Sequence, residues 1–106
     1  MISIINKSID EKIEMLRSLK DSNYLLNVVN VASAIVQVLK SGGKVLTAGN
    51  GGSAADAQHF TGEIVGRFLI ERDSYAAVSL VVDPVVMTCI SNDYGYDNAI
   101  ARQVEG

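Results

Sequence analysis

Apolar residues recur at steps of three and four over the first twenty positions, with charged residues between them. This spacing predicts an amphipathic helix up to about Lys20, whose apolar face must pack against another part of the protein. A second helix is predicted over 24–40, because Asp21-Ser22-Asn23 offers caps before it and Gly42-Gly43 suits a left-handed helix end after it. The second helix is apolar on most sides. We therefore expect it to be buried, for example between a sheet and another subunit.

The rest of the chain alternates short β-like runs with helical segments. The first unit expected is a strand at 44–48, a glycine-rich turn and a helix from 53 or 54 to about 66. After a polar loop at 67–75, the second unit expected is a strand at 76–82 and a helix from Pro84 to Ile90 capped by Asp83. A turn-rich loop at 91–98 and a helix beginning at 99 follow. Alternating β and α elements predict a parallel sheet in an α/β fold.

The chain has 106 residues and is 48% hydrophobic, which is enough for one core. We expect a single partial domain over 1–106, with N-terminal helices at 1–41 and the first β/α units of the sheet at 42–106. Two strands are too few for a stable doubly wound sheet, because each face and each edge must be covered. The expectation is therefore the N-terminal half of a larger α/β domain, or a subunit that depends on an oligomer.

The charge and composition of the chain limit the kinds of molecule that we expect it to bind. The net charge is −3, and no basic stripe is present for a phosphate backbone or an anionic lipid surface. The apolar runs are short, and no secretory leader pattern opens the chain. We expect a cytoplasmic protein that binds neither nucleic acid nor membrane. A single cysteine excludes an internal disulfide and a multi-cysteine metal site.

The turn between the first strand and its helix is rich in glycine. Gly49, Gly51 and Gly52 allow positive φ and close approach of a ligand to bare backbone, and the helix that follows presents free N–H groups. The turn suits an anionic or polyhydroxylated ligand, or it is a tight connection that binds nothing. A Walker phosphate loop is excluded, because no Gly-Lys-Ser/Thr follows.

The same turn matches the dinucleotide fingerprint as Gly49-x-Gly51-x-x-Ala54. That motif needs an acidic residue about twenty positions further on, at the end of the second strand. Asp73 lies near that distance but in the predicted loop, whereas Asp83 ends the strand but comes too late. A dinucleotide-binding protein stays open as an alternative.

The predicted helix after the turn carries Ser53, Asp56, His59 and Glu63 on one face, because they are three or four residues apart. A histidine and a glutamate at i and i+4 can hold a divalent metal, or they form a surface hydrogen bond. Glu63 is also spaced to pair with Arg67 one turn on. Further along, Ser91-Asn92-Asp93 falls in a predicted loop that returns to the carboxyl edge of the sheet, where it holds sugar hydroxyls or forms an Asx turn.

The segments that carry these features closely resemble the phosphoheptose isomerases, which are sugar-isomerase (SIS) domain proteins. The resemblance lies in 49–60, in 62–68, in 91–96 and in 101–105, in that order and with similar gaps. It implies a three-layer α/β/α sandwich with a parallel sheet, here incomplete, in a homotetramer. It also implies the ketose–aldose isomerisation of sedoheptulose 7-phosphate to D-glycero-D-manno-heptose 7-phosphate, for bacterial lipopolysaccharide or capsule.

The resemblance also implies roles for particular residues. Glu63 would be the catalytic base, and His59 and Glu63 would be two ligands of the zinc ion found in some members. The substrate-binding residues would be Asn50, Gly51, Gly52, Ser53, Glu63, Asn92 and Asp93.

The family's main phosphate loop, Ser-Thr-Ser-Gly-x-Ser, and its late glutamine and histidine have no counterpart in these residues. The partner acid therefore has no candidate here. A non-catalytic SIS-domain regulator that binds a replication initiator or a sugar phosphate is the main alternative function.

Overall fold

The structure is a computed structural model that describes residues 1–20 and 22–106. It divides into two compact units, Met1–Gln37 and Val38–Gly106, which are described separately. The predicted cap at Asp21 lies outside the described residues.

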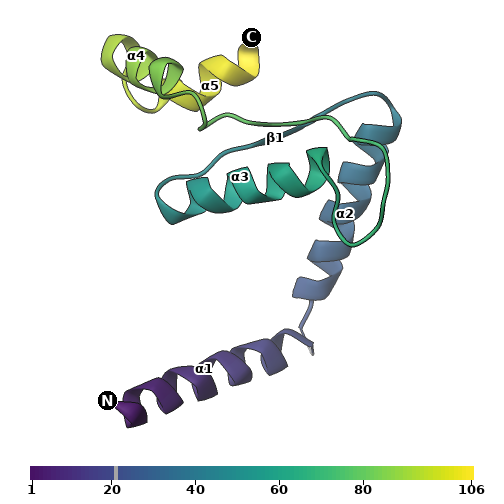
Figure 1. Cartoon of the computed structure of the whole chain (residues 1–106), viewed down its shortest axis with the longest axis vertical. Coiled ribbons are helices and arrows are strands. Elements are labelled where there is room, and N and C mark those ends of the chain that lie inside the picture. The colour runs from purple at the N-terminus through teal and green to yellow at the C-terminus, as the bar shows by residue number, and fades with distance from the viewer. Residues whose placement is uncertain (21) are drawn as a thin grey trace. The chain divides into compact units, whose positions relative to one another are not determined.

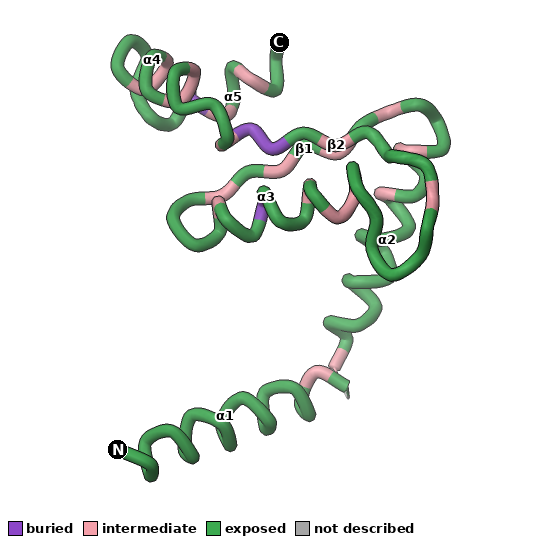
Figure 2. The backbone as a smooth tube through the Cα atoms, in the orientation of Figure 1, coloured by how far each residue is buried: buried purple, intermediate pink, exposed green. Residues whose placement is uncertain are grey.

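The first unit contains two helices, α1 (Ile2–Lys20) and most of α2 (Tyr24–Lys40), at the bounds that the hydrophobic spacing predicts (Figure 1). Neither helix buries a residue, and their apolar faces are open to solvent (Figure 2). The burial expected for α2 is therefore not found among the described residues. Among the described residues, no single helix has both the length and the apolar content to span a membrane, although α1 and α2 pass that test as a bent pair.

The second unit begins as α2 ends. Gly42 has φ 80°, the left-handed conformation expected at this helix end. Two short strands follow, β1 (Val45–Thr47) and β2 (Ala77–Ser79), which pair in parallel with Val45 opposite Ala77. The predicted α/β class with a parallel sheet is confirmed. The strands are shorter than expected because each has only the other to pair with in the described part of the chain.

Helix α3 (Gly52–Val65) runs back along the sheet and packs on both strands (Figure 1). The Thr47 hydroxyl joins the two layers, because it donates to the Ala57 carbonyl at 3.0 Å and lies 2.7 Å from the Thr61 hydroxyl. Ala57 is buried at this contact. The contact fixes the middle of α3 against the carboxyl end of β1.

Helices α4 (Pro84–Tyr94) and α5 (Asn98–Glu105) pack on each other after β2. Asp83 caps α4 as predicted, since its carboxylate accepts from the backbone N–H groups of Val85 and Val86 at 2.9 and 3.0 Å. This acidic residue is therefore engaged in a helix cap rather than presented to a dinucleotide ribose. The buried residues of the second unit are few and mostly small: Ala57, Ser79, Leu80 and Ala99.

The prediction of a loop at 91–98 is wrong for its first half, because α4 continues through Ser91, Asn92 and Asp93. The Ser91 hydroxyl bonds to the carbonyl of Met87 inside the helix at 2.6 Å, so it does not break the helix. The helix ends where Gly95 adopts φ 87°.

Candidate functional site

Both β-to-α connections leave the sheet at the same edge, because β1 and β2 are parallel. At this edge the glycine turn makes a tight bend, with the Ser53 N–H bonded to the Asn50 carbonyl at 3.0 Å and Gly51 at φ 55°. Gly51 is the N-cap of α3 and provides no side-chain cap. The Ser53 and Ala54 N–H groups bond to the carbonyls of Asn50 and Gly51, so among the described residues the Gly52 N–H is left in the first turn of α3 as a donor to a ligand oxygen.

Gly49 and Gly52 serve different purposes in this turn. A Cβ at Gly49 would collide with the Ser53 carbonyl group, whereas a Cβ at Gly52 would meet no atom within 4 Å. Gly49 is therefore required for packing of the turn against the helix. The space beside Gly52 is open to a ligand.

An open groove with a volume of about 550 Å³ runs along α3. Its residues are Asp56, His59, Phe60, Glu63, Ile64, Phe68 and Arg72. The structure thus brings together three of the four polar residues predicted to share a face. Ser53, the fourth, is not part of this groove.

Within the groove, His59 Nε2 lies 3.6 Å from Glu63 Oε1. The His59 side chain is 80% exposed and the Glu63 side chain 34% exposed. The carboxylate is thus partly shielded yet open to a ligand in the groove. Glu63 does not pair with Arg67, which instead pairs with Glu71 at 3.3 Å.

The two groups fit part of a zinc site. Two ligands of a tetrahedral zinc at about 2.1 Å lie roughly 3.4 Å apart, close to the separation of His59 and Glu63. Among the described residues, no cluster of three or more His, Cys, Asp or Glu side chains is placed to hold a metal. The pair would supply two ligands of such a site, and the described part of this chain offers no third beside them.

Arg72 is a groove residue that the sequence pattern does not single out. Its guanidinium donates to the Glu63 carbonyl at 2.6 Å and to the Asp73 carbonyl at 2.9 Å, and it lies 4.5 Å from the centre of the Tyr75 ring. These contacts fold the segment after α3 back onto the helix end that carries Glu63. The only sequence signal is an arginine three residues before a tyrosine, which is too common to predict such a contact.

Asn92 and Asp93 lie side by side on the last turn of α4, where Asn92 Nδ2 donates to Asp93 Oδ1 at 2.9 Å. Neither belongs to the groove along α3. The link to the glycine turn comes instead from Tyr96, whose hydroxyl donates to Asn50 Oδ1. Tyr96 is a second residue that the sequence pattern does not single out.

The predicted residues are spread along α3 rather than gathered at one point. Glu63 lies eleven positions after Gly52 in α3, and the helical rise of about 1.5 Å per residue places the two about 16 Å apart along the helix. The turn and the carboxylate therefore contact different parts of any shared ligand.

These features define an α/β protein with a glycine turn at the carboxyl edge of a parallel sheet and, on the helix that follows, an open groove that contains His59 and Glu63. The SIS domain family model matches residues 9–106, so the chain belongs to the SIS domain family.

The similar proteins are phosphoheptose isomerases. The chain is 51% identical over 92 residues to the phosphoheptose isomerase of Bradyrhizobium sp. strain BTAi1, covering 87% of this chain and 46% of that protein. It is 42% identical over 105 residues to the one from Trichlorobacter lovleyi, covering 99% and 53%. The solved phosphoheptose isomerase of Neisseria gonorrhoeae superposes with a TM-score of 0.76 at 36% identity, covering 96% of this chain and 53% of that one. The chain thus spans about half the length of the relatives it matches.

Proposed function

We propose that this chain is part of a sugar-phosphate isomerase that converts sedoheptulose 7-phosphate to D-glycero-D-manno-heptose 7-phosphate. The observation that carries the proposal is the Glu63 carboxylate, which is partly shielded in an open groove beside His59. The substrate is inferred from the chain's relatives, which are phosphoheptose isomerases.

Moving a carbonyl group from C2 to C1 requires a base that reaches the C1 hydrogen. Glu63 removes that proton, the electron pair forms the C1–C2 double bond of an enediol, and the C2 oxygen gains a proton. A proton is then returned to carbon C2, while the C1 hydroxyl loses its proton and becomes the aldehyde. We assign the first transfer to Glu63, and no residue of this chain is assigned as the partner acid.

The glycine turn holds another part of the substrate. Asn50, Gly51, Gly52 and Ser53 offer amide, hydroxyl and backbone N–H groups to its oxygens. Asn92 and Asp93, at the end of α4, contact further sugar hydroxyls. Because the turn lies about 16 Å from Glu63 along α3, its contacts are made to atoms remote from C1.

We further propose that His59 and Glu63 are ligands of a zinc ion, with the remaining ligands supplied from outside this chain. When bound, zinc would polarise a sugar oxygen as a Lewis acid. The histidine also restrains the Glu63 side chain from the adjacent helical turn.

The solvent-exposed apolar faces of α1 and α2 support assembly with other subunits, and we propose a homotetramer. We place the activity in the cytoplasm, in heptose synthesis for lipopolysaccharide or capsule. No contact with nucleic acid or membrane is proposed.

The test is Glu63→Gln in the full-length protein, because glutamine keeps the size of the side chain and cannot take up the proton. We expect turnover of sedoheptulose 7-phosphate to fall by about 10²- to 10⁴-fold, the range for loss of a general base. Substrate binding, measured by calorimetry, should persist. Glu71→Gln is the matched control, since Glu71 pairs with Arg67 and is not a groove residue. Near-normal turnover by Glu63→Gln would remove Glu63 from the role of base.

A further inference from the structure

Tyr96 lies on the short connection between α4 and α5, where local backbone hydrogen bonds hold the chain. Gly95 turns the chain with φ 87°, its carbonyl accepts from the Asn98 N–H at 3.1 Å, and the Tyr96 carbonyl accepts from the Ala99 N–H at 3.0 Å. Ala99 is fully buried directly after this turn. The direction in which the Tyr96 ring leaves the backbone is therefore set by local hydrogen bonds.

The helix after Tyr96 is anchored to the sheet. Gln103 Nε2 donates to the Leu80 carbonyl at 2.9 Å, immediately after β2, and to the Ala99 carbonyl at 2.8 Å within α5. Leu80 in turn donates its N–H to the Thr47 carbonyl of β1 at 2.9 Å. The α4–α5 connection and the glycine turn are thus fastened to the same two strands.

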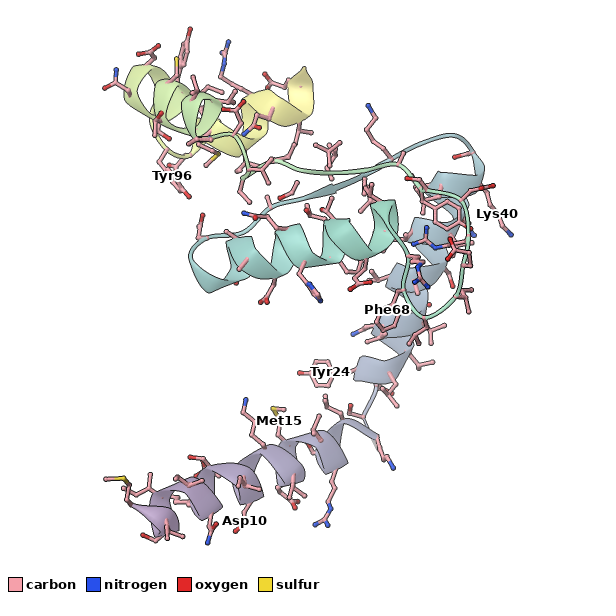
Figure 3. The ribbon with its side chains drawn as sticks, in the orientation of Figure 1. Asp10, Met15, Tyr24, Lys40, Phe68 and Tyr96 are labelled. Carbon is pink, nitrogen blue, oxygen red and sulfur yellow. The ribbon has the colours of Figure 1, made fainter. Side chains whose placement is uncertain are left out.

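The Tyr96 side chain projects from the connection between α4 and α5 (Figure 3). Its hydroxyl reaches Asn50, which is 46 residues earlier in the sequence. It donates to Oδ1 of the Asn50 side chain. A phenol is a good donor, and an amide oxygen is the acceptor of that side chain. With Oδ1 occupied, the two Nδ2 hydrogens are the part of the amide that remains for a ligand.

We propose that Tyr96 is a positioning residue that fixes the orientation of the Asn50 amide, so that Asn50 acts toward the ligand as a hydrogen-bond donor. The group it holds is then an acceptor, a hydroxyl, carbonyl or phosphate oxygen of the sugar phosphate. This inference rests on the proposed function and adds a residue to it. Because Asn50 lies in the turn, remote from Glu63, the contact contributes equally to substrate and transition-state binding.

The kinetic test is Tyr96→Phe in the full-length protein, which removes the hydroxyl and keeps the ring. A single hydrogen bond at this half-exposed position corresponds to about a two- to tenfold rise in KM, with kcat unchanged. Tyr94→Phe is the control: the Tyr94 ring lies against Arg102, and no hydrogen bond of its hydroxyl is found among the described residues. In an Asn50→Ala background, Tyr96→Phe should raise KM no further. An unchanged KM, or an additive effect in that background, would overturn the proposal.

A second readout does not depend on activity. The side-chain amide signals of Asn50 in a ¹⁵N–¹H NMR spectrum should shift on Tyr96→Phe and stay in place on Tyr94→Phe. Unmoved signals would overturn the orienting role of Tyr96. Failure of the wild-type protein to convert sedoheptulose 7-phosphate would instead count against the proposed function, and the NMR result would still decide whether Tyr96 orients Asn50.

Discussion

Gly49→Ala tests whether the glycine turn is built as the structure describes. The added Cβ would lie 2.5 Å from the Ser53 carbonyl carbon and 2.9 Å from the Ala54 nitrogen, and both atoms belong to the backbone of the first turn of α3. Backbone atoms cannot rotate away as a side chain can, so either the turn or the helix start must move. Overpacking of this kind costs about 1–3 kcal/mol of unfolding free energy.

The matched control is Gly52→Ala, three residues along the same turn. Gly52 begins α3, has no positive φ, and a Cβ there has open space around it. Alanine is the better helix former by about 0.5–1 kcal/mol, so this variant should be as stable as the wild type or slightly more stable.

The assay is thermal unfolding followed by circular dichroism, with both variants compared with the wild type. A loss of 1 kcal/mol lowers Tm by about 4–8 °C in a domain of 60–100 residues and by about 2–4 °C in one of 150–250 residues, so the fall expected for Gly49→Ala exceeds the error of the measurement in either case. Equal Tm values for Gly49→Ala and Gly52→Ala would refute the close approach of the turn to the helix.

Three further predictions concern ligand, metal and helix cap. Gly52→Ala should weaken binding of sedoheptulose 7-phosphate in calorimetry although the fold is unharmed, because its methyl group fills the space left for ligand; unchanged affinity would argue that the turn binds nothing. His59→Ala should lower the affinity for zinc at least about tenfold, since it removes one of two neighbouring ligands. A competition titration with a chelator measures this affinity, and an unchanged value would exclude His59 from the metal site. Asp83→Ala should cost about 1 kcal/mol through loss of the α4 cap, whereas Asp83→Asn should cost less; equal losses would show that the capping bonds are not what Asp83 contributes.

The elements of the fold are largely predictable because their signals are local. Helix α2 has its predicted bounds of 24–40, and the Asp83-Pro84 pair marks the start of α4. The end of α4 is predicted too early, because Ser91, Asn92 and Asp93 are typical turn residues. The helix tolerates them, and only the left-handed Gly95 ends it.

The candidate site is predictable only where its residues share one helix. His59 and Glu63 meet because a spacing of four residues places them together on any α-helix. Arg72 and Tyr96 depend on how an irregular segment and a helix connection fold back, and these contacts have no periodic pattern in the sequence.

The central claim is that Glu63 serves as the base of a ketose–aldose isomerisation. The most direct test follows sedoheptulose 7-phosphate by proton NMR in the presence of the full-length wild-type protein and, separately, its Glu63→Gln variant. The account predicts that the anomeric proton signal of the aldoheptose 7-phosphate appears with the wild type and not, over the same time, with the variant. A substrate spectrum unchanged by the wild-type protein, or an aldose signal that grows equally fast with Glu63→Gln, would contradict it.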